Sequence, residues 1–562
     1  FFDLGGDSIV SIQLVSRARA AGIELTVADV FEHRTPAALA GIAEAAAETL
    51  AEDPDAGIGE LPLTPIMHWW REHGGPIDGF HQAMAVQAPA ALDLAGLTTA
   101  VQAVLDRHDA LRLRLTRASD EDWRIEVRPR GEVRAEQLVD RVDFADAAAS
   151  GDTETQRALL VEHGRAATRQ LTPESGSLVR AVWFDAGTGR PGLLLLAVHH
   201  LVVDGVSWRI LLPDLAAAWS QVAAGREPVL EGVPTSLRTW AGRLAEEAGS
   251  ARRIEELPLW RAALSGPDPQ LGARPMDREQ DVFGTARTLT LTLPSEVTEP
   301  LLTSVPAAFG AGIKDVLLTA YTVAVASWRA RRQPTQGNAV LVEMEGHGRE
   351  PVVRGADLGR TVGWFTSSFP VRLNPGQVDW NDFWGGGAAV DAVLAKVRAH
   401  LAELPDGGIG YGLLRYLNER TGPQLAALAT PQLGFNYLGR FAAGGTDAAA
   451  QDWSPPPGAA GLTGGGDAAM PMAHSLDLNA QTEDRPDGPR LVASWAWPDE
   501  MFDEADVRDL AESWFRALTS MVARAHDLTA APARSGTSTL VRVDQQELDE
   551  FENDLDDEGL SW

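Results

Sequence analysis

The order of apolar and polar positions along the chain predicts a mixed α/β protein. An unbroken apolar run at residues 193–198 predicts a strand that is buried on both faces. Residues 92–113 carry apolar side chains at helical spacing and then continue into a strand. Beyond the central strand, Asp204 and Gly205 turn the chain into a second helical pattern that includes Trp208. Strands and helices therefore follow one another through this half of the chain.

The second half of the chain shows the same succession. From Arg287 onward polar and apolar residues alternate with period two, which predicts a strand. The further elements predicted here are an apolar helix at 308–329, strands at 474–481 and 491–497, and a closing helix at 504–524. We expect two α/β lobes with a cleft between them, over residues 61–265 and 266–527.

Stretches with few large apolar residues separate and follow these lobes. Residues 1–44 have a helical pattern, and residues 45–60 are small, acidic and interrupted by Pro and Gly, as in a linker. The Gly- and Ala-rich stretch after Arg440 predicts a mobile loop. Residues 528–562 form an acidic tail that fits either a solvated linker helix or a docking segment for a basic partner.

The length, net charge and cysteine content of the chain exclude several kinds of binding partner and site. The chain of 562 residues is too long for one hydrophobic core, and its net charge of −31 argues against nucleic acid as a partner. The absence of cysteine excludes disulfides, thiolate metal ligands and a cysteine nucleophile. The sequence contains no signal-peptide pattern and no apolar run of bilayer length, so we expect a cytoplasmic protein without a membrane partner.

Two adjacent histidines, His199 and His200, interrupt the central apolar run. Strand alternation points their rings in opposite directions, so one is expected in the wall of the fold and the other at a cavity. Histidine is the side chain best suited to exchange protons near neutral pH. The pattern alone fits two readings: a pair of core histidines beside a turn, or an acid–base site in which His199 is structural and Asp204 is a buried ion-pair partner.

Two other stretches carry candidate chemistry. LGGDSI places Ser8 at the start of a helix, where it either caps the helix or holds a phosphodiester at the positive end of the helix dipole. EGHGRE, at residues 345–350, directly follows a predicted strand, and glycines flank its histidine. Glu345 therefore lies at a strand end, where it belongs either to a charged turn or to a site that backbone and ligand approach closely.

Together these motifs resemble one family. The HHxxxDG pattern of His199, His200, Asp204 and Gly205 is the signature of an acyltransferase-like superfamily that includes the condensation and epimerization domains of nonribosomal peptide synthetases. The continuation to Trp208 resembles the epimerization branch. So do EGHGRE and four other motifs: IKDVLL at 313–318, RTVGWFTSSFPVRL at 360–373, GGIGYGLLRYL at 407–417 and GFNYLGR at 434–440.

The resemblance spans residues 1 to about 526 and implies a fold class. It implies an α/β protein of two chloramphenicol-acetyltransferase-like lobes that form a V-shaped domain. The C-terminal part of a helical-bundle peptidyl carrier protein precedes them. Because the carrier's first helix is missing, we expect either a fragment of a longer protein or a carrier that cannot fold well alone. Two positions depart from the family: Met67 replaces the usual glutamine, and Gly407 stands where lysine is frequent.

The resemblance also implies a cofactor and partners. In the family the serine of the LGGDSI motif carries 4′-phosphopantetheine, so Ser8 is the expected attachment site, and a phosphopantetheinyl transferase is the expected modifying enzyme. Asp7 before this serine is typical of carriers that precede epimerization domains. An upstream adenylation domain and a downstream D-selective condensation domain are the expected neighbours, whereas nucleic acid and membrane are not expected.

The implied activity is epimerization of an L-aminoacyl or peptidyl thioester at Cα. His200, Glu345 and Tyr437 are the catalytic residues that the resemblance implies, and the supporting motif residues are His199, Asp204, Gly205, Trp208 and Asn436. No metal is expected. Two alternatives are a condensation domain that forms a peptide bond and a catalytically silent homologue that recruits a partner. The amino acid that is epimerized cannot be deduced from this sequence.

Overall fold

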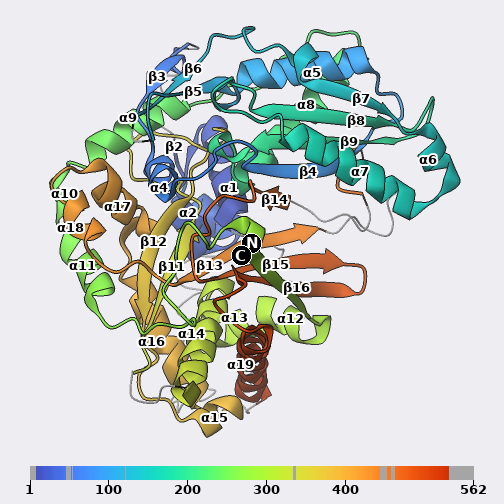
Figure 1. The fold of residues 1–562 in the computed structure, drawn as a ribbon. Helices are drawn as coiled ribbons and strands as arrows, with labels where there is room; N and C mark the ends of the chain where they lie inside the picture. Colours follow the sequence, from blue (N-terminus) through green and yellow to red (C-terminus); the bar gives the residue numbers. More distant parts are fainter. Residues whose placement is uncertain are drawn as a thin grey trace, which may run out of the picture.

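Two α/β lobes and a small helical unit make up the structure, a computed structural model that describes residues 8–45, 52–53, 55–120, 122–332, 337–442, 452–456 and 463–530. Figure 1 shows the two lobes, with their sheets meeting near the middle of the molecule. This arrangement confirms the predicted fold class.

Asp7 lies outside the described residues, and so does the acidic tail except for residues 528–530.

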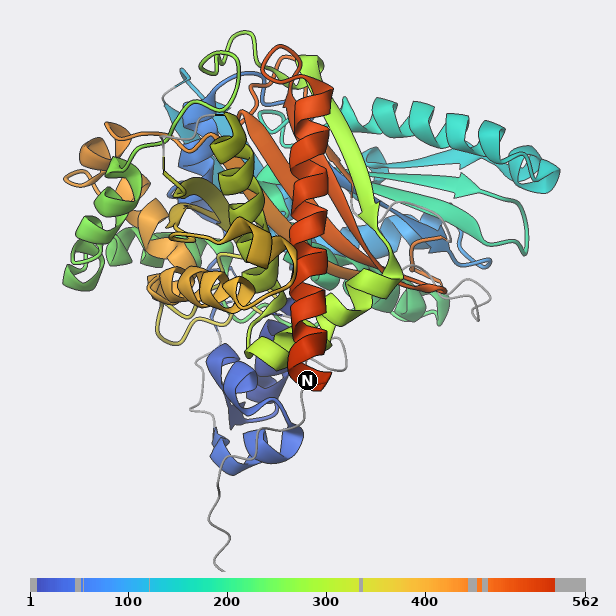
Figure 2. The ribbon, with the colours of Figure 1, turned by 90° about the horizontal axis from the view of Figure 1, so that it is seen from below.

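The helical unit contains residues 8–45. Its helices are α1 (Ser8–Ala20), α2 (Val27–His33) and α3 (Pro36–Ile42), and β1 (Ile23–Glu24) pairs with β2 (Glu44–Ala45). Thr26 caps α2 in a capping box with Asp29, and Leu25, Val30 and Leu39 form a small core. Figure 2 shows this unit as a separate blue bundle beside the main body.

The first lobe is built on a five-stranded sheet around the central strand β9 (Gly192–His199). The sheet order is β14 (Thr463–Gly465), β4 (His81–Ala88), β9, β8 (Val179–Asp185) and β7 (Val139–Asp143). Beside it lies a three-stranded sheet of β3 (Gly59–Leu61), β6 (Trp123–Val127) and β5 (Leu113–Arg117).

Strand β9 is covered on both faces, as its continuous apolar run predicts. Leu194 and Leu196 face a core that includes α5 (Leu94–Arg107) and α8 (Gly205–Ala223). Leu193 and Leu195 face the other side, where α6 (Ala145–Ser150) and α7 (Thr153–Thr168) pack. The other helices of this half are α4 (Pro65–His73), α9 (Leu237–Glu247), α10 (Ala251–Ile254) and α11 (Leu257–Ser265).

The second lobe has a six-stranded sheet. Its order is β10 (Ala286–Leu293), β16 (Gly488–Pro498), β15 (Leu476–Arg485), β13 (Leu433–Ala442), β11 (Val340–Gly346) and β12 (Ser367–Leu373). Strand β13 runs parallel to both of its neighbours, and the other pairs are antiparallel.

Helices cover one face of this second sheet. They are α12 (Ser295–Leu302), α13 (Ser304–Phe309), α14 (Ile313–Arg332), α15 (Trp380–Trp384), α16 (Ala389–Ala402) and α19 (Glu504–Ala530), while the short α17 (Ile409–Gly412) and α18 (Gly422–Ala426) lie at the edge. The side chains of Val342 and Met344 on β11 enter the helix-covered core, so the alternate residues of that strand face the opposite side.

Two predictions about local structure are wrong. The apolar helix begins at Ile313 and not at residue 308, because the preceding helix ends at Phe309 and Gly310 caps it in a left-handed conformation with a φ of 58°. The Gly-rich stretch after Arg440 is partly ordered within the described residues: β14 pairs with β4, and the Trp453 ring lies 5.9 Å from that of Trp219. This stretch therefore crosses from the second lobe to the first.

No single described helix is long and apolar enough to span a membrane. The segments Ser295–Phe309 and Ile313–Arg332 meet that length and composition only as a pair, which is bent by 96°.

Candidate functional site

The two adjacent histidines have different surroundings. His199 is fully buried, and both of its ring nitrogens form hydrogen bonds: Nε2 donates to the Ile77 carbonyl at 2.8 Å, and Nδ1 accepts from the Leu201 amide at 3.1 Å. Burial lowers the pKa of His199 to about 3, so the ring is neutral. His199 therefore secures the end of β9 and is not available for chemistry.

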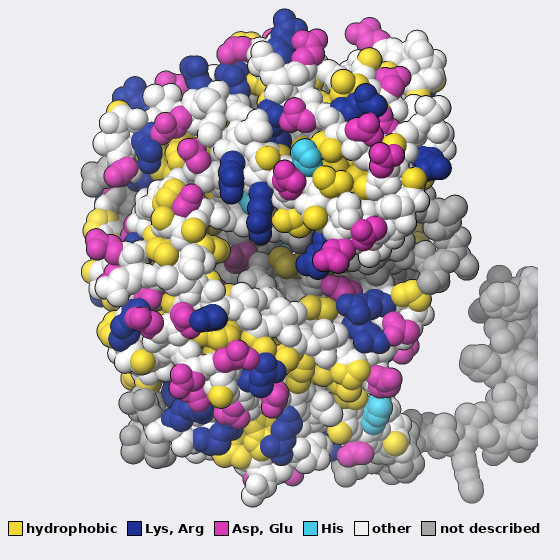
Figure 3. All heavy atoms as spheres, turned by 45° about the vertical axis from the view of Figure 1, so that its right-hand side comes forward, with side chains coloured by type: hydrophobic (Ala, Val, Ile, Leu, Met, Phe, Trp, Pro, Cys, Tyr) yellow, Lys and Arg dark blue, Asp and Glu magenta, His cyan; other side chains and the backbone are white. Residues whose placement is uncertain are grey.

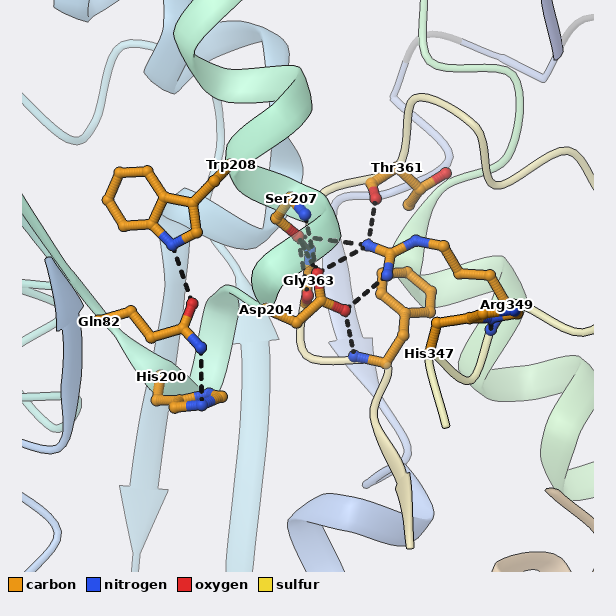
Figure 4. A network of polar contacts seen from close by, with 10 residues as sticks. Gln82, His200, Asp204, Ser207, Trp208, His347, Arg349, Thr361 and Gly363 are labelled. Atoms are coloured by element: carbon orange, nitrogen blue, oxygen red, sulfur yellow. Dashed lines mark hydrogen bonds and ion pairs between the residues drawn. The ribbon is translucent and has the colours of Figure 1, made fainter. Parts of the chain in front are cut away.

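His200 begins a short 3-10 turn (His200–Val202) and lies between two aromatic rings. The ring of Phe80 stacks on it at 4.8 Å and that of Trp364 lies at 4.7 Å. Its Nε2 is 3.0 Å from Gln82 Nε2, while Trp208 Nε1 donates to Gln82 Oε1 at 2.8 Å (Figure 4).

This chain of contacts assigns the tautomer of His200. An indole N–H can only donate, so Gln82 must turn its oxygen to Trp208 and its NH₂ group to His200. His200 Nε2 is then the acceptor, and the ring proton is on Nδ1, which forms no hydrogen bond of normal geometry within the described residues. Burial lowers the pKa of His200 to about 4, so the ring is a neutral imidazole near pH 7.

Asp204 joins the two lobes through a buried ion pair. Arg349, from the EGHGRE motif, donates to its two carboxylate oxygens at 2.5 and 3.1 Å, and the Phe365 amide donates to it at 3.2 Å (Figure 4). Ser207 adds a second link between the lobes, because its hydroxyl contacts the backbone of Gly363. The sequence identified Asp204 as an ion-pair partner but not Arg349 as its counterpart.

Glu345 lies near the end of β11, on the face of the sheet that is not covered by helices. Asn436 on the adjacent β13 donates a hydrogen bond from Nδ2 to Glu345 Oε2 at 2.8 Å. Lys314 at the start of α14 donates to the Glu345 backbone carbonyl at 3.2 Å. The carboxylate is thus held at one oxygen, and within the described residues the other oxygen has no hydrogen-bond donor, which leaves it to a ligand.

The environment of Glu345 raises its pKa to about 7. Removal from bulk water is the largest cause, and the negative charge of Asp477 adds to it. The side chain itself is exposed, so it contacts water in the cleft while protein surrounds it at longer range. Water in the cleft screens the charge, which limits the size of the shift but keeps its direction. A carboxyl group with such a pKa can both accept and return a proton near neutrality.

Tyr437 is placed differently from Glu345. Side chains alternate along β13, so Asn436 lies on the open face of the sheet and Tyr437 on the face toward the helix-covered core. The Tyr437 hydroxyl forms a hydrogen bond with Thr482 Oγ1 at 2.9 Å. The residue that the structure brings to Glu345 is therefore the supporting Asn436 and not Tyr437.

A largely apolar pocket lies between the lobes, next to these groups. Its lining includes Trp69 and Trp240 from the first lobe, and Gly348, Trp364 and Ser368 from the second. Trp364 also packs on His200, so the Trp364 ring is shared between this pocket and the surroundings of His200. Figure 3 shows a hollow between the two halves of the molecule. No described atom comes within 4 Å of a side chain added at Gly205, which leaves open space at that turn.

The helical unit touches the second lobe through α1. Ser16 Oγ donates to Asp357 Oδ2 at 3.4 Å, and Arg19 donates to the Ala356 carbonyl at 3.4 Å. Ser8 is the first residue of α1, so its residue type and place fit a phosphodiester at the positive helix end. The same loop that contacts α1 leads from Arg349 into the first lobe.

Sequence reasoning missed Gln82, Lys314 and Arg349. Arg349 and Lys314 lie in motifs that it had singled out, so their side chains could have been considered. Gln82 lies in an ordinary strand, and only the pairing of β4 with β9 brings it to His200. No sequence signal marks it.

Comparisons with known proteins agree with this arrangement. A family model described as the condensation domain matches residues 61–533, and one described as a phosphopantetheine attachment site matches residues 1–43. One of the linear gramicidin synthase proteins of Brevibacillus parabrevis is 35% identical over 98% of this chain, which spans 7% of that relative. Chondramide synthase cmdD of Chondromyces crocatus is 37% identical over 78% of the chain, which covers 11% of its length.

Solved structures show the same fold. The epimerization domain from the third module of tyrocidine synthetase B superposes with a TM-score of 0.68 at 27% identity, covering 85% of this chain and 99% of that one. The first condensation domain of the calcium-dependent antibiotic synthetase, in complex with a substrate analogue, gives a TM-score of 0.57 at 19% identity, with 83% and 96% covered. The second likeness concerns the fold alone.

Proposed function

The chain belongs to the condensation-domain family of nonribosomal peptide synthetases, with a phosphopantetheine attachment site ahead of that domain, and from this premise we propose that it epimerizes an aminoacyl or peptidyl thioester at Cα. The observation that carries the proposal is Glu345, a carboxyl group with a pKa of about 7 that Asn436 orients at the cleft. The likeness to a solved epimerization domain supports it.

The residues of this chain divide the chemistry between the two lobes. Phosphopantetheine, attached in this proposal at Ser8, supplies a thioester, which makes the Cα proton of the acyl group more acidic. Near pH 7 Glu345 is only partly protonated, so it can give up or take a proton, and neutral His200 can accept a proton at Nε2. One member takes the Cα proton, and the other returns a proton to the opposite face, so that L and D forms interconvert.

Gln82 and Asn436 prepare these two groups. Gln82 keeps His200 Nε2 free of a proton, and its amide must move away when Nε2 takes one up. Asn436 holds one oxygen of Glu345 and leaves the other for the substrate. The Asp204–Arg349 pair holds the turn after His200 against the loop after Glu345, so it keeps the two lobes in register.

The proposal requires other domains and one enzyme. A phosphopantetheinyl transferase has to prime the carrier, an adenylation domain has to load it, and a downstream D-selective condensation domain has to accept the product. The relatives, a linear gramicidin synthase protein and a chondramide synthase, are many times longer than this chain, which leaves room for such domains.

The test is loss of Cα exchange in single variants. We would load Ser8 with an L-aminoacyl-phosphopantetheine in D₂O, hydrolyse the thioester, and measure both deuterium at Cα and the D:L ratio. Glu345→Gln and His200→Ala should each lower exchange by about 10²-fold or more. Glu350→Gln is the matched control, because burial also raises its pKa to about 7 but it lies outside the proposed pair, and it should keep exchange.

Two outcomes would replace the proposal. If no loaded residue exchanges its Cα proton and a second acyl carrier yields an amide, the chain is a condensation domain. If neither reaction occurs in a correctly folded and loaded protein, the chain is a silent homologue that recruits a partner. A Ser8→Ala variant that still accepts phosphopantetheine would move the attachment site elsewhere.

A further inference from the structure

A row of charged side chains lies directly beneath Glu345 in the second sheet. Glu343 precedes Glu345 by two residues on β11, so both point to the same face. In the adjacent strands Glu343 pairs with Gly434, and Gly434 pairs with Asp477. The row Glu343–Gly434–Asp477 therefore runs across three strands, one step below the row that contains Glu345 and Asn436.

His474 connects the two carboxylates of this row. Its Nδ1 is 2.7 Å from Asp477 Oδ1 and its Nε2 is 3.3 Å from Glu343 Oε2, so both ring nitrogens meet a carboxylate. The residue is 8% exposed, and its ring lies over Gly434. A side chain at Gly434 would come within 2.6 Å of His474 Nδ1 and closer still to Asp477, so only glycine leaves room for this bridge.

Both contacts require His474 to carry a proton on each nitrogen. Burial alone would lower the pKa of His474, but Asp477 and Glu343 outweigh burial and raise it well above its ordinary value. Burial would likewise raise the pKa of Glu343, but hydrogen bonds from His474 and Ser368 hold it below its ordinary value. The row therefore contains one positive and two negative charges, and its net charge is −1.

We propose that His474 is a positioning residue, a fixed imidazolium that sets how readily Glu345 exchanges its proton. The row acts on Glu345 through space, because Asn436 and not His474 holds the Glu345 carboxylate. Lone carboxylates beneath Glu345 would favour its protonated form strongly. The cation of His474 offsets one of them and keeps both forms of Glu345 populated near neutrality.

Other charged groups face Glu345 and its row. Lys314 from α14 favours the ionised form of Glu345, and it also acts on Glu350. From the first lobe, His73 at the end of α4 faces Glu343 and His474; burial lowers the pKa of His73 to about 4, so it is neutral. Arg278, which donates a hydrogen bond to the Glu72 carbonyl, disfavours the charged form of His73. None of these groups lies within the row, so the two variants of the row leave them unchanged.

The decisive test uses two variants whose effects have opposite sign. His474→Gln removes the cation, so the inflection that Glu345 causes in the pH profile of Cα exchange should move up by about one pH unit. Asp477→Asn removes an anion, and the same inflection should move down by about one unit. A residue with a purely structural role would lower the rate in both variants without moving the inflection in opposite directions.

The matched control is His108→Gln in the first lobe. His108 is fully buried and its Nε2 lies 2.8 Å from Asp214, but this pair is in the core of the other lobe. The variant should lose stability much as His474→Gln does, while the inflection stays where it is in the wild type.

The inference rests on the proposed function, so a second readout is independent of activity. A ¹³C NMR titration of the carboxyl groups of the full chain, with Glu345→Gln to assign the Glu345 signal, should show the same opposite shifts. If neither variant moves the Glu345 titration, or both move it in one direction, the inference is wrong. If the titration shifts but no Cα exchange occurs, the charged row is confirmed and the epimerase proposal fails.

Discussion

Two charged clusters lie close to the candidate site, and they differ in charge balance. Asp204 and Arg349 form a pair with no net charge, and neighbouring backbone groups complete its hydrogen bonds. Glu343, His474 and Asp477 form a row with an excess negative charge. The first cluster joins the lobes, whereas the second lies within one sheet.

The difference explains what each cluster can do. In a balanced pair the two charges largely cancel at longer range, so its main contribution is geometric and is lost when either partner is removed. Asp204 still favours the charged form of the nearby His200. An unbalanced row acts on the next ionisable group, which here is Glu345. A charged cluster beside a cleft therefore points to a functional group mainly when the cluster carries a net charge.

The largest expected effect comes from breaking the balanced pair. Arg349→Ala leaves the Asp204 carboxylate buried without its partner, which should lower the free energy of unfolding by about 3–5 kcal/mol. Urea unfolding followed by tryptophan fluorescence measures it. The control is Arg287→Ala, which removes an exposed pair with Asp499 and should cost far less stability, because water screens that pair. Equal losses in the two variants would show that the buried pair does not join the lobes.

The next largest effect is a difference in Cα exchange rate between variants on the two faces of β13. Asn436→Ala removes the hydrogen bond to Glu345 Oε2, and we expect about tenfold slower Cα exchange, the equivalent of one hydrogen bond to a charged group. Tyr437→Phe is its neighbour and control: it removes only the hydroxyl that meets Thr482, and it should change exchange less than about twofold by the same reasoning. If Tyr437→Phe is the slower variant, the hydroxyl belongs to the site and the assignment from strand alternation is wrong.

Residues that a local pattern determines could be predicted from the sequence. The apolar run of β9 predicts burial on both faces, and strand alternation predicts that His199 points into the wall of the fold, where its Nε2 now meets the Ile77 carbonyl. The GFNYLGR motif at residues 434–440 identifies Asn436 as a supporting residue. The start of α14 was misplaced, because Gly310 ends one helix within an apolar stretch that looks continuous.

Residues that depend on contacts far apart in the chain could not be predicted. Gln82 is 118 positions from His200, and Arg349 is 145 positions from Asp204. His474 is in no motif, and its role depends on Gly434 leaving space in the neighbouring strand. Hydrophobic periodicity reports which face of an element is buried, but it does not report which element covers that face.

The smallest expected effect is a change in stability with pH that follows from the raised pKa of Glu345. The pKa of Glu345 is about 7 in the folded chain, and the ordinary pKa of a glutamate, 4.5, applies to the unfolded chain. Between these two pH values the folded chain therefore holds a proton that the unfolded chain releases. Stability linked to Glu345 is therefore present below about pH 4.5 and is lost as pH rises through about 7.

Glu345→Gln cannot lose that proton, so it should be more stable relative to the wild type at pH 8 than at pH 5. Cleft water screens the exposed carboxylate, and we expect a difference on the order of 1 kcal/mol between the two pH values. Unfolding curves of both proteins at both pH values measure it. A relative stability that does not depend on pH would mean that the pKa of Glu345 is not raised in the folded chain, and neither burial nor the row would then act on it.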